Sequence, residues 1–283
     1  MSLMQILRTI EDMRTKWRSA KTGKQMGFVP TMGALHEGHL SLVRAAKSKC
    51  DIVAASIFVN PTQFGPKEDF AKYPRTFERD CELLKNEGVD FLFAPSAEEM
   101  YPKEAVTWVT VEGLSDKLCG RSRPGHFRGV TTVVSKLFHI LEPDVAFFGQ
   151  KDAVQLVLIR RMVRDLNMPV EIVGCPIVRD ADGLAMSSRN AYLSAEERKS
   201  ATVLNRTLKE IRQRFDQGER SSARLLSAGM EIFQQETGAR LDYLEIVDPE
   251  TLDPLSAVQG NALVALAAYV GTTRLIDNLT LMA

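Results

Sequence analysis

The sequence of 283 residues has little cysteine, no excess of either charge and no long hydrophobic run. Its four cysteines form no Cys-x-x-Cys pair, which argues against a disulfide scaffold and favours a reducing compartment. Thirty-six basic residues balance thirty-six acidic ones, so the chain offers no basic field for nucleic acid. No apolar run is long enough to cross a membrane. We therefore expect a cytoplasmic protein whose partners include no nucleic acid and no membrane.

Apolar runs and helical patterns alternate through the first part of the chain. The runs 51–59 and 145–148 are nearly continuous in apolar residues, as a parallel strand buried on both faces requires. After about residue 180 the pattern changes to helices followed by three β-like runs, 241–247, 262–270 and 274–281. We predict an α/β fold, in which a Rossmann-like parallel sheet forms a nucleotide-binding domain over residues 1–180. A smaller α+β C-terminal domain follows over residues 181–283.

The most informative stretch is Pro30-Thr-Met-Gly-Ala-Leu-His-Glu-Gly-His39, which follows a short apolar run. It predicts a strand, a turn with glycine, and a helix that begins near Gly38. Gly33 and Gly38 let the backbone come close to a ligand, and the unpaired N–H groups at a helix start favour phosphate. His36 and His39 are three residues apart, which places them on one side of the first turn. Both then offer N–H donors to a polyphosphate.

Simpler interpretations of this stretch exist. A single histidine is more often structural than catalytic, and a turn with glycine is common. His36 and His39 could form half of a zinc site, but their spacing is not that of metalloproteases, and no cysteine pair or third histidine is near them in the sequence. The whole His-x-Gly-His pattern is more specific and resembles the nucleotide-binding signature of the nucleotidyltransferase superfamily, which includes class I aminoacyl-tRNA synthetases. We expect ATP to bind here and expect no metal site in the protein.

Three more segments are candidates for the same site. Asn60–Gly65 and Gly149–Asp152 each follow a buried strand, and ligands of open α/β sheets bind at the carboxyl ends of strands. Lys151 would suit a phosphate there, although most lysines are surface residues. The loop Asp182–Asn190 carries small hydroxyls and an arginine, which suit phosphate oxygens. The alternative for this loop is a serine-rich hinge.

Two neighbouring segments keep alternatives open. Cys119–Phe127 is predicted to be a loop, either a solvated surface loop or a mobile basic flap over an anion. Behind it, apolar residues recur at helical spacing from Val130 to Leu141 and predict a helix. Most of that stripe is expected to be core, and its first valines also suit the wall of an apolar pocket.

Several motifs together resemble the pantothenate synthetase (pantoate–β-alanine ligase) family, over the whole chain and more loosely in its C-terminal part. The motifs are Pro30 to His39, Phe58-Val-Asn-Pro-x-Gln-Phe64, Tyr73-Pro-Arg-Thr76, Arg123-Pro-Gly-His-Phe127, Phe148-Gly-x-Lys-Asp152, Met186-Ser-Ser-Arg-Asn190 and Arg274-Leu-Ile-Asp-Asn278.

The resemblance implies a two-step reaction. The carboxylate of (R)-pantoate attacks the α-phosphorus of Mg²⁺-ATP to give pantoyl adenylate and pyrophosphate, and β-alanine then displaces AMP to form pantothenate. Positioning and charge stabilisation would account for most of the catalysis. The family also implies a homodimer, with the small domain as a hinged cover over ATP.

The resemblance also assigns roles to residues. The catalytic set is His36, His39, Lys151, Ser187, Ser188 and Arg189. The ATP-binding set is Met32, Gly33, Ala34, Leu35, His36, Glu37, Gly38, His39, Gly149, Gln150, Lys151, Asp152, Val178, Met186, Ser187, Ser188 and Arg189, with adenine near Val178 and Met186. For pantoate and β-alanine the set is Gln63, Gln155, Pro30, Val130, Val133 and Val134.

Three competing functions remain at this point. A simple nucleotidyltransferase would stop at the nucleotidyl product and need no amine pocket. A relative of the aminoacyl-tRNA synthetases would need an RNA-binding module, against which the neutral charge argues. A nucleotide sensor would bind ATP without turnover.

Overall fold

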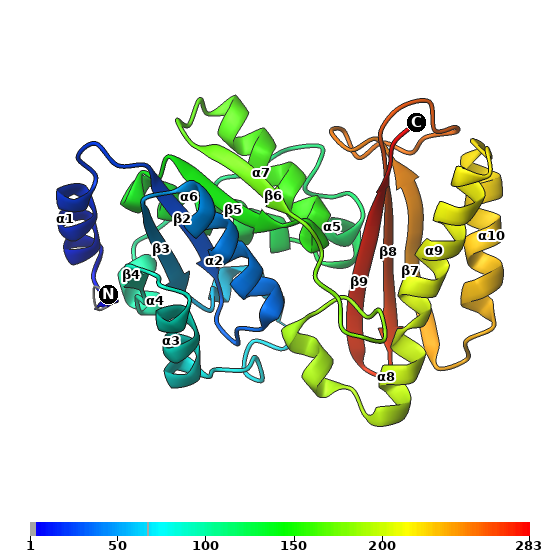
Figure 1. Cartoon of the computed structure of the whole chain (residues 1–283), viewed down its shortest axis with the longest axis horizontal. Coiled ribbons are helices and arrows are strands. Elements are labelled where there is room, and N and C mark those ends of the chain that lie inside the picture. Colours follow the sequence, from blue (N-terminus) through cyan, green and yellow to red (C-terminus); the bar gives the residue numbers. More distant parts are fainter. Residues whose placement is uncertain (1–3, 67) are drawn as a thin grey trace. The chain divides into compact units, whose positions relative to one another are not determined.

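The computed structural model describes residues 4–66 and 68–283, which fall into two compact units (Figure 1). Unit 1 contains the chain up to Ser115, Arg123–Gln150 and Leu158–Pro176. Unit 2 contains Asp116–Ser122, Lys151–Val157 and Ile177–Ala283. The main change of unit therefore follows Pro176, and two short segments from the earlier chain also belong to unit 2. The domain ranges 1–180 and 181–283 stay a prediction.

Unit 1 is built on a six-stranded sheet in which every pair is parallel. Its strands are β1 (Gln5–Leu7), β2 (Met26–Thr31), β3 (Ile52–Ile57), β4 (Phe91–Phe93), β5 (Val145–Gly149) and β6 (Glu171–Cys175). They lie in the order β1-β4-β3-β2-β5-β6. From β2 the chain continues to β3 and β4 on one side, and it then returns to β5 on the other side. The predicted Rossmann-like sheet is confirmed, and its topological switch point lies between β2 and β5.

Helices cover both faces of this sheet (Figure 1). On one face, α2 (Glu37–Lys49) and α3 (Phe77–Asn86) bury Val43 and Leu84 against Val29 and Val53. On the other face lie α1 (Ile10–Ala20) and α6 (His126–Leu141). There the rings of Trp17 and Phe91 are 5.9 Å apart, and those of Phe138 and Phe148 are 6.3 Å apart. Alternate residues of the same strands thus enter two apolar layers, as the nearly continuous apolar runs predicted.

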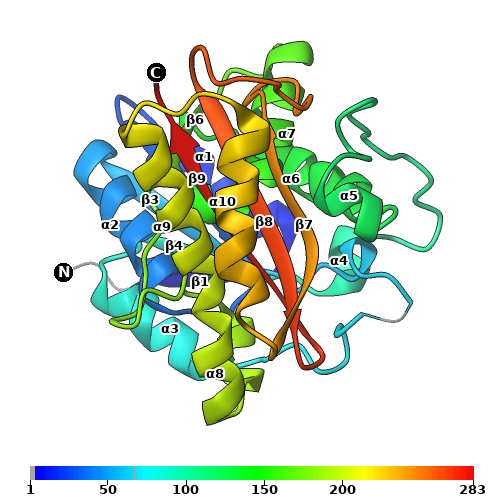
Figure 2. The same ribbon diagram turned by 90° about the vertical axis from the view of Figure 1, so that its right-hand side faces the viewer.

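Unit 2 contains a three-stranded antiparallel sheet with α9 (Val203–Asp216) and α10 (Ser222–Gln234) on one face (Figure 2). Its strands are β7 (Ala239–Val247), β8 (Ala262–Val270) and β9 (Thr273–Leu281). These two helices pack on the sheet through buried residues such as Ile211 and Phe233. The three β-like runs and the small α+β fold are confirmed.

The prediction of a loop over Cys119–Phe127 is wrong. Cys119–Ser122 forms a short helix, α5, and α6 already begins at His126. Long-range contacts that the local sequence does not reveal hold α5 to β7: the Cys119 thiol lies 2.9 Å from the Tyr243 hydroxyl, and Ser122 donates to Asp242 at 2.9 Å. Burial raises the pKa of Tyr243, so this hydroxyl stays protonated.

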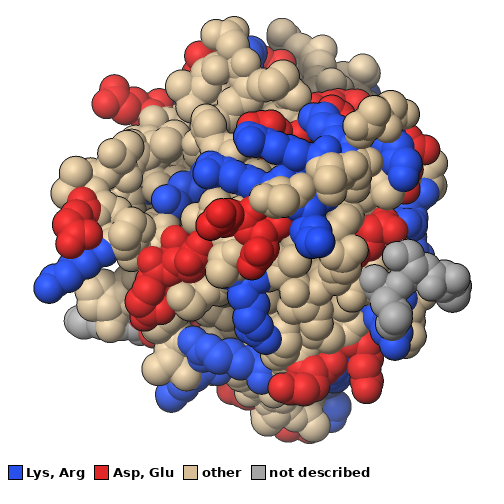
Figure 3. All heavy atoms as spheres, turned by 90° about the vertical axis from the view of Figure 1, so that its left-hand side faces the viewer, with Lys and Arg blue, Asp and Glu red and all other residues tan. Residues whose placement is uncertain are grey.

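Charge is evenly distributed where it can be seen. On the face in Figure 3, acidic side chains lie beside basic ones. Among the residues with a described structure, no helix is both long enough and apolar enough to span a membrane.

Candidate active site

The turn after β2 has a backbone that few residues adopt. Thr31 donates its hydroxyl proton to the Ser56 carbonyl at 2.6 Å, and its Oγ1 accepts from the Gly33 N–H at 3.1 Å. Gly33 and Ala34 then follow with φ of 81° and 51°, both in the left-handed region. Glycine adopts this region freely, but alanine does so at a cost of about 1–2 kcal/mol. The turn therefore needs support from the surrounding structure.

A buried carboxylate gives that support. Asp80, on α3 and only 1% exposed, accepts from the N–H groups of Ala34 at 2.8 Å and Leu35 at 2.9 Å. It also accepts from the Thr76 hydroxyl at 3.1 Å. Three donors satisfy a charge that would otherwise be costly to bury. The sequence analysis did not single out Asp80. The feature that could have revealed it is an acidic residue one turn before Leu84, on the apolar side of a helix.

The two histidines of this stretch form the start of α2. His36 is the N-cap residue, so the helix begins at Glu37, one position earlier than predicted, and the His36 Nδ1 accepts from the Gly38 N–H at 3.2 Å. His39 returns the interaction, because its Nδ1 accepts from the His36 N–H at 3.3 Å. The ring centroids are 4.1 Å apart. The pair is a capping box made by two imidazoles, a role usually taken by Ser or Thr with Glu or Gln.

This arrangement decides which nitrogen carries the proton. In a neutral imidazole, a nitrogen that accepts a hydrogen bond has no proton, so the proton lies on the other nitrogen. Both Nδ1 atoms accept from backbone N–H groups, and both rings therefore present Nε2–H as their donor. These donors lie at the start of α2, where the helix dipole favours an anion.

Gln63 lies in the same unit as this turn and contacts it. It ends a short 3₁₀ helix, η1 (Pro61–Gln63), and is 7% exposed. Its Nε2 is 3.0 Å from the Met32 sulfur, and its Oε1 accepts from the Asn60 Nδ2 at 3.0 Å. The structure thus brings one predicted pantoate residue next to one predicted ATP residue.

The apolar candidates are all in unit 1. Pro30 pairs with Ser56 in the central sheet. Val130, Val133 and Val134 are buried on α6, and the preceding Gly129 packs against the backbone of Thr62 and Gln63. The structure therefore brings the start of this stripe to Gln63.

Unit 2 contains Lys151 and Gln155. Lys151 belongs to a short 3₁₀ helix, η2 (Gln150–Asp152), that directly follows β5, and Gln155 lies in the first turn of α7 (Ala153–Asp165). The Lys151 carbonyl accepts from the Asn278 side chain at 2.8 Å, and its Nζ lies 3.7 Å from Asp152. Asn278 is a second residue without a role in the sequence analysis, although it lies in a quoted motif.

The remaining candidates follow a hairpin in unit 2. The Met186 N–H donates to the Val178 carbonyl at 3.0 Å, so these two backbone groups already bind each other. Arg179 forms a fork with buried Asp277, at 2.7 and 2.9 Å. Ser187 caps the 3₁₀ helix η3 (Ser188–Tyr192) by accepting from the Arg189 N–H at 3.3 Å. The Arg179–Asp277 pair therefore attaches the base of the hairpin to β9.

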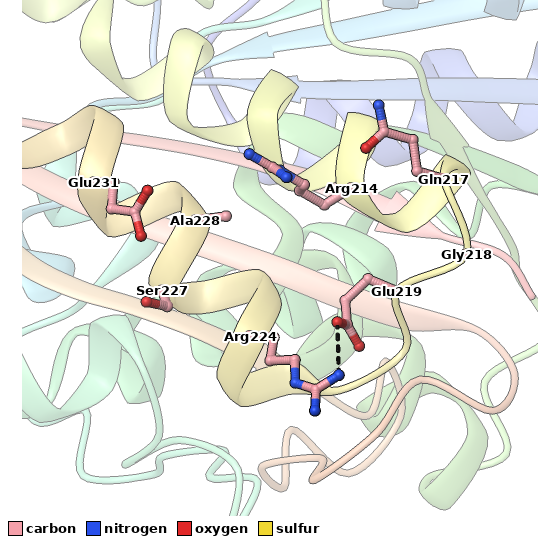
Figure 4. Close-up of a pocket in the computed structure, with 8 residues that line it drawn as sticks. All are labelled: Arg214, Gln217, Gly218, Glu219, Arg224, Ser227, Ala228 and Glu231. Atoms are coloured by element: carbon pink, nitrogen blue, oxygen red, sulfur yellow. Dashed lines mark hydrogen bonds and ion pairs between the residues drawn. The ribbon is translucent and has the colours of Figure 1, made fainter.

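A separate hollow of about 550 Å³ lies between the end of α9 and α10 (Figure 4). None of the candidate residues lines this hollow. The residues that line it are Arg214, Gln217, Gly218, Glu219, Arg224, Ser227, Ala228 and Glu231. Arg224 pairs with Glu219 at 3.4 Å across the hollow, and Arg214 pairs with Glu210 at 2.7 Å. We assign no ligand to this hollow.

Known proteins identify the family. The family model described as pantoate-beta-alanine ligase matches residues 5–280. A pantothenate synthetase of Acidobacterium capsulatum is 63% identical over 275 residues, which cover 97% of this chain and 92% of the relative. The chain belongs to the pantoate–β-alanine ligase family. A second relative, the pantothenate synthetase of Koribacter versatilis, is 58% identical over 99% of this chain and 97% of its own.

Solved structures of the ligase family have the same fold. The pantothenate synthetase of Thermus thermophilus superposes with a TM-score of 0.93 at 51% identity, covering 98% of this chain and 99% of the other. The pantoate-beta-alanine ligase of Francisella tularensis, solved with β-γ ATP and β-alanine, has a TM-score of 0.79 at 36% identity and covers 98% and 97%. The resemblance stated from the motifs is therefore confirmed.

The Asp80 carboxylate can be tested by substitution with its amide. Asp80→Asn replaces one acceptor oxygen with an NH₂ group that faces backbone donors, so one buried N–H loses its partner. We expect the free energy of unfolding to fall by about 1–3 kcal/mol and ATP affinity to fall with it. Chemical denaturation and ATP titration measure both. An unchanged stability would show that the turn does not depend on this carboxylate.

The histidines can be separated into a capping role and a ligand role. Asparagine is among the best N-cap residues, so His36→Asn should preserve stability, whereas His36→Ala should lose about 0.5–2 kcal/mol. Both variants should lower the adenylation rate by about 10²–10³, as expected for loss of one transition-state donor. His39→Ala should do the same. Near-normal adenylation in His36→Asn would mean that His36 acts only as a cap.

Proposed function

We propose that this chain condenses (R)-pantoate with β-alanine to form pantothenate, using ATP and releasing AMP and pyrophosphate. The observation that carries this proposal is the turn after β2, at the switch point of the sheet, in a chain that belongs to the ligase family. There the fold orients two imidazole Nε2–H donors at a helix start, which is the environment that a polyphosphate requires.

ATP is proposed to bind through several segments of the chain. The turn Met32–His39 offers backbone and imidazole donors, and Gly149–Asp152 follows the adjacent strand β5. Lys151, Ser187, Ser188 and Arg189 supply the other donors to the phosphates. Val178 and Met186 are proposed to lie near adenine. The Met186 N–H and the Val178 carbonyl bind each other, so the other backbone groups of these residues would face adenine. Mg²⁺ is proposed to arrive bound to the ATP phosphates, which is its usual mode in such sites.

Pantoate is proposed to bind beside the phosphates through Gln63 and Gln155. A neutral amide orients a carboxylate without forming the strong ion pair that an arginine fork would form, so the carboxylate keeps its nucleophilicity. Pro30, Val130, Val133 and Val134 are proposed as the apolar wall for the two methyl groups. The contact between Gln63 and Met32 supports this arrangement, because it places an amide next to the ATP turn.

The reaction then needs little covalent participation by the protein. The pantoate carboxylate oxygen forms a bond to the α-phosphorus, and the bond to the pyrophosphate oxygen breaks. The β-alanine nitrogen next attacks the acyl carbon, AMP leaves, and the amine loses a proton. Donors fixed before the reaction stabilise the charge that develops on the phosphoryl oxygens. The Francisella relative, solved with β-γ ATP and β-alanine, supports the same two substrates here.

We further propose a cytoplasmic homodimer. Analytical ultracentrifugation of the purified chain tests the oligomeric state.

The two glutamines provide a test of the pantoate site. Gln63→Ala and Gln155→Ala each leave a polar group of pantoate without a partner, at a cost of about 1–3 kcal/mol in binding. Calorimetry with pantoate and with ATP should therefore show a weaker pantoate interaction and a nearly unchanged ATP interaction. An equal loss for ATP would place these glutamines outside the pantoate site.

The adenylate route predicts a partial reaction. Attack at the α-phosphorus is reversible while pyrophosphate is present, so the enzyme should exchange labelled pyrophosphate into ATP with pantoate alone. Omission of pantoate should abolish most exchange, and addition of β-alanine should yield AMP and pantothenate. The rival route through pantoyl phosphate would release ADP. Formation of ADP, or exchange that needs β-alanine, would contradict the proposed mechanism. A sensor would show neither product.

A further inference from the structure

The start of α6 contacts Gln63 directly. His126, the first residue of α6, lies with its Nδ1 2.7 Å from the Gln63 carbonyl oxygen. Its Nε2 lies 2.9 Å from the Arg123 NH1 group. A carbonyl only accepts and a guanidinium only donates, so Nδ1 carries the proton and Nε2 accepts. His126 is therefore held in the tautomer opposite to that of His36 and His39.

A carboxylate, that of Glu68, fixes the Arg123 side chain. Its Nε and NH2 groups donate to the two oxygens of Glu68 at 2.7 and 2.6 Å, which is the bidentate geometry of a strong pair. Both side chains are largely buried, at 15% and 24% exposure. Burial alone would raise the pKa of Glu68, but the hydrogen bonds and charge of Arg123, together with the Gly65 backbone, outweigh it and the pKa lies below its ordinary value. The guanidinium is thus engaged with Glu68, with His126 and with the Gln63 carbonyl, which its NH2 group approaches at 3.5 Å.

A second contact lies one turn later on α6. A Cβ atom on Gly129 would lie 2.4 Å from the Thr62 carbonyl oxygen and 2.7 Å from the Gln63 Cα, so only glycine fits there without displacement. The Gly129 carbonyl also accepts from the Asn60 Nδ2 at 3.2 Å, and the same nitrogen donates to the Gln63 Oε1 at 3.0 Å. Residues 126 and 129 are three apart and share one side of the helix. The start of α6 therefore holds both the backbone and the amide of Gln63.

We propose that His126 is a positioning residue for pantoate recognition, which fixes the Gln63 backbone and, through it, the direction of the Gln63 amide. Arg123 and Glu68 fix the His126 tautomer that makes this possible. The inference rests on the proposed function, because it assigns Gln63 to pantoate. It gives Arg123 and His126 a role that is separate from any contact with a phosphate.

The test compares two substitutions at one position. His126→Asn retains a side-chain N–H close to the position of Nδ1 and should still donate to the Gln63 carbonyl. His126→Ala removes this short hydrogen bond and leaves the carbonyl with the longer one from the Arg123 NH2 group at 3.5 Å. We expect His126→Ala to raise the pantoate Kd on the order of tenfold, by loss of one hydrogen bond in a closed site. The ATP Kd should stay unchanged, and His126→Asn should recover most of the pantoate affinity. In steady-state kinetics the pantoate KM should change more than kcat.

The same helix offers a matched control. His139 on α6 also places its Nδ1 2.7 Å from a backbone carbonyl, that of Ser135. It lies thirteen residues beyond His126, which is about 20 Å along a helix. His139→Ala should leave the pantoate Kd unchanged, so a shared loss in both variants would indicate a general effect on α6 and would overturn the proposal.

A double-mutant cycle decides whether His126 acts through Gln63. If it does, His126→Ala combined with Gln63→Ala should bind pantoate no more weakly than Gln63→Ala alone. Additive losses would overturn the proposal, as would an unchanged pantoate Kd in His126→Ala. Should His126→Ala fail to fold, Glu68→Gln replaces it, because this variant weakens the hold on Arg123. Glu68→Gln should then raise the pantoate Kd while His126→Asn stays near the wild-type value, and an unchanged Kd in Glu68→Gln would overturn the proposal. A wild-type chain that forms no pantothenate would instead refute the proposed function itself.

Discussion

The turn after β2 depends on one buried carboxylate. Asp80 is nearly inaccessible to water, and its charge is tolerated because three donors surround it. Two of these donors are successive backbone N–H groups, which can converge on one carboxylate only if the chain turns sharply before them. The left-handed backbone at Gly33 and Ala34 makes that turn, at a conformational cost that the hydrogen bonds offset. Without Asp80, the N–H groups of Ala34 and Leu35 would lose their acceptor, and the turn that leads to His36 would lose this support.

The histidine capping box combines two requirements in one geometry. A helix start needs an acceptor for its first N–H groups, and a polyphosphate needs donors. An imidazole serves both, because it accepts at Nδ1 and donates at Nε2. Serine or aspartate would cap the helix equally well, but neither would place a ring N–H beyond the cap. The cap also sets the tautomer, so the direction of both Nε2–H donors is fixed before any anion binds.

The sequence predicted what depends on local pattern. The strands β3 and β5 and the three strands of unit 2 were evident because their apolar runs are continuous or evenly spaced. The first turn of α6 was missed, because Arg123-Pro-Gly-His has the composition of a loop and its contacts with Glu68 and Gln63 are far away in the sequence. Asp80 and Asn278 were missed for a related reason. Each side chain binds a backbone group 45 or more positions away, and no spacing in a single sequence reveals such a pair.

In unit 2, one strand contacts two of the candidate segments. Asp277 and Asn278 are neighbours on β9, so their side chains point to opposite sides of the strand. Asp277 holds Arg179 at the base of the hairpin that leads to Ser187, and Asn278 holds the carbonyl of Lys151. The Asn278 N–H also donates to Asp277 at 2.8 Å, which fixes the carboxylate. Lys151 and Arg179 are far apart in sequence, yet each is attached to one of two neighbouring residues of β9. The two adjacent residues of β9 therefore link the segment at Lys151 to the hairpin at Arg179.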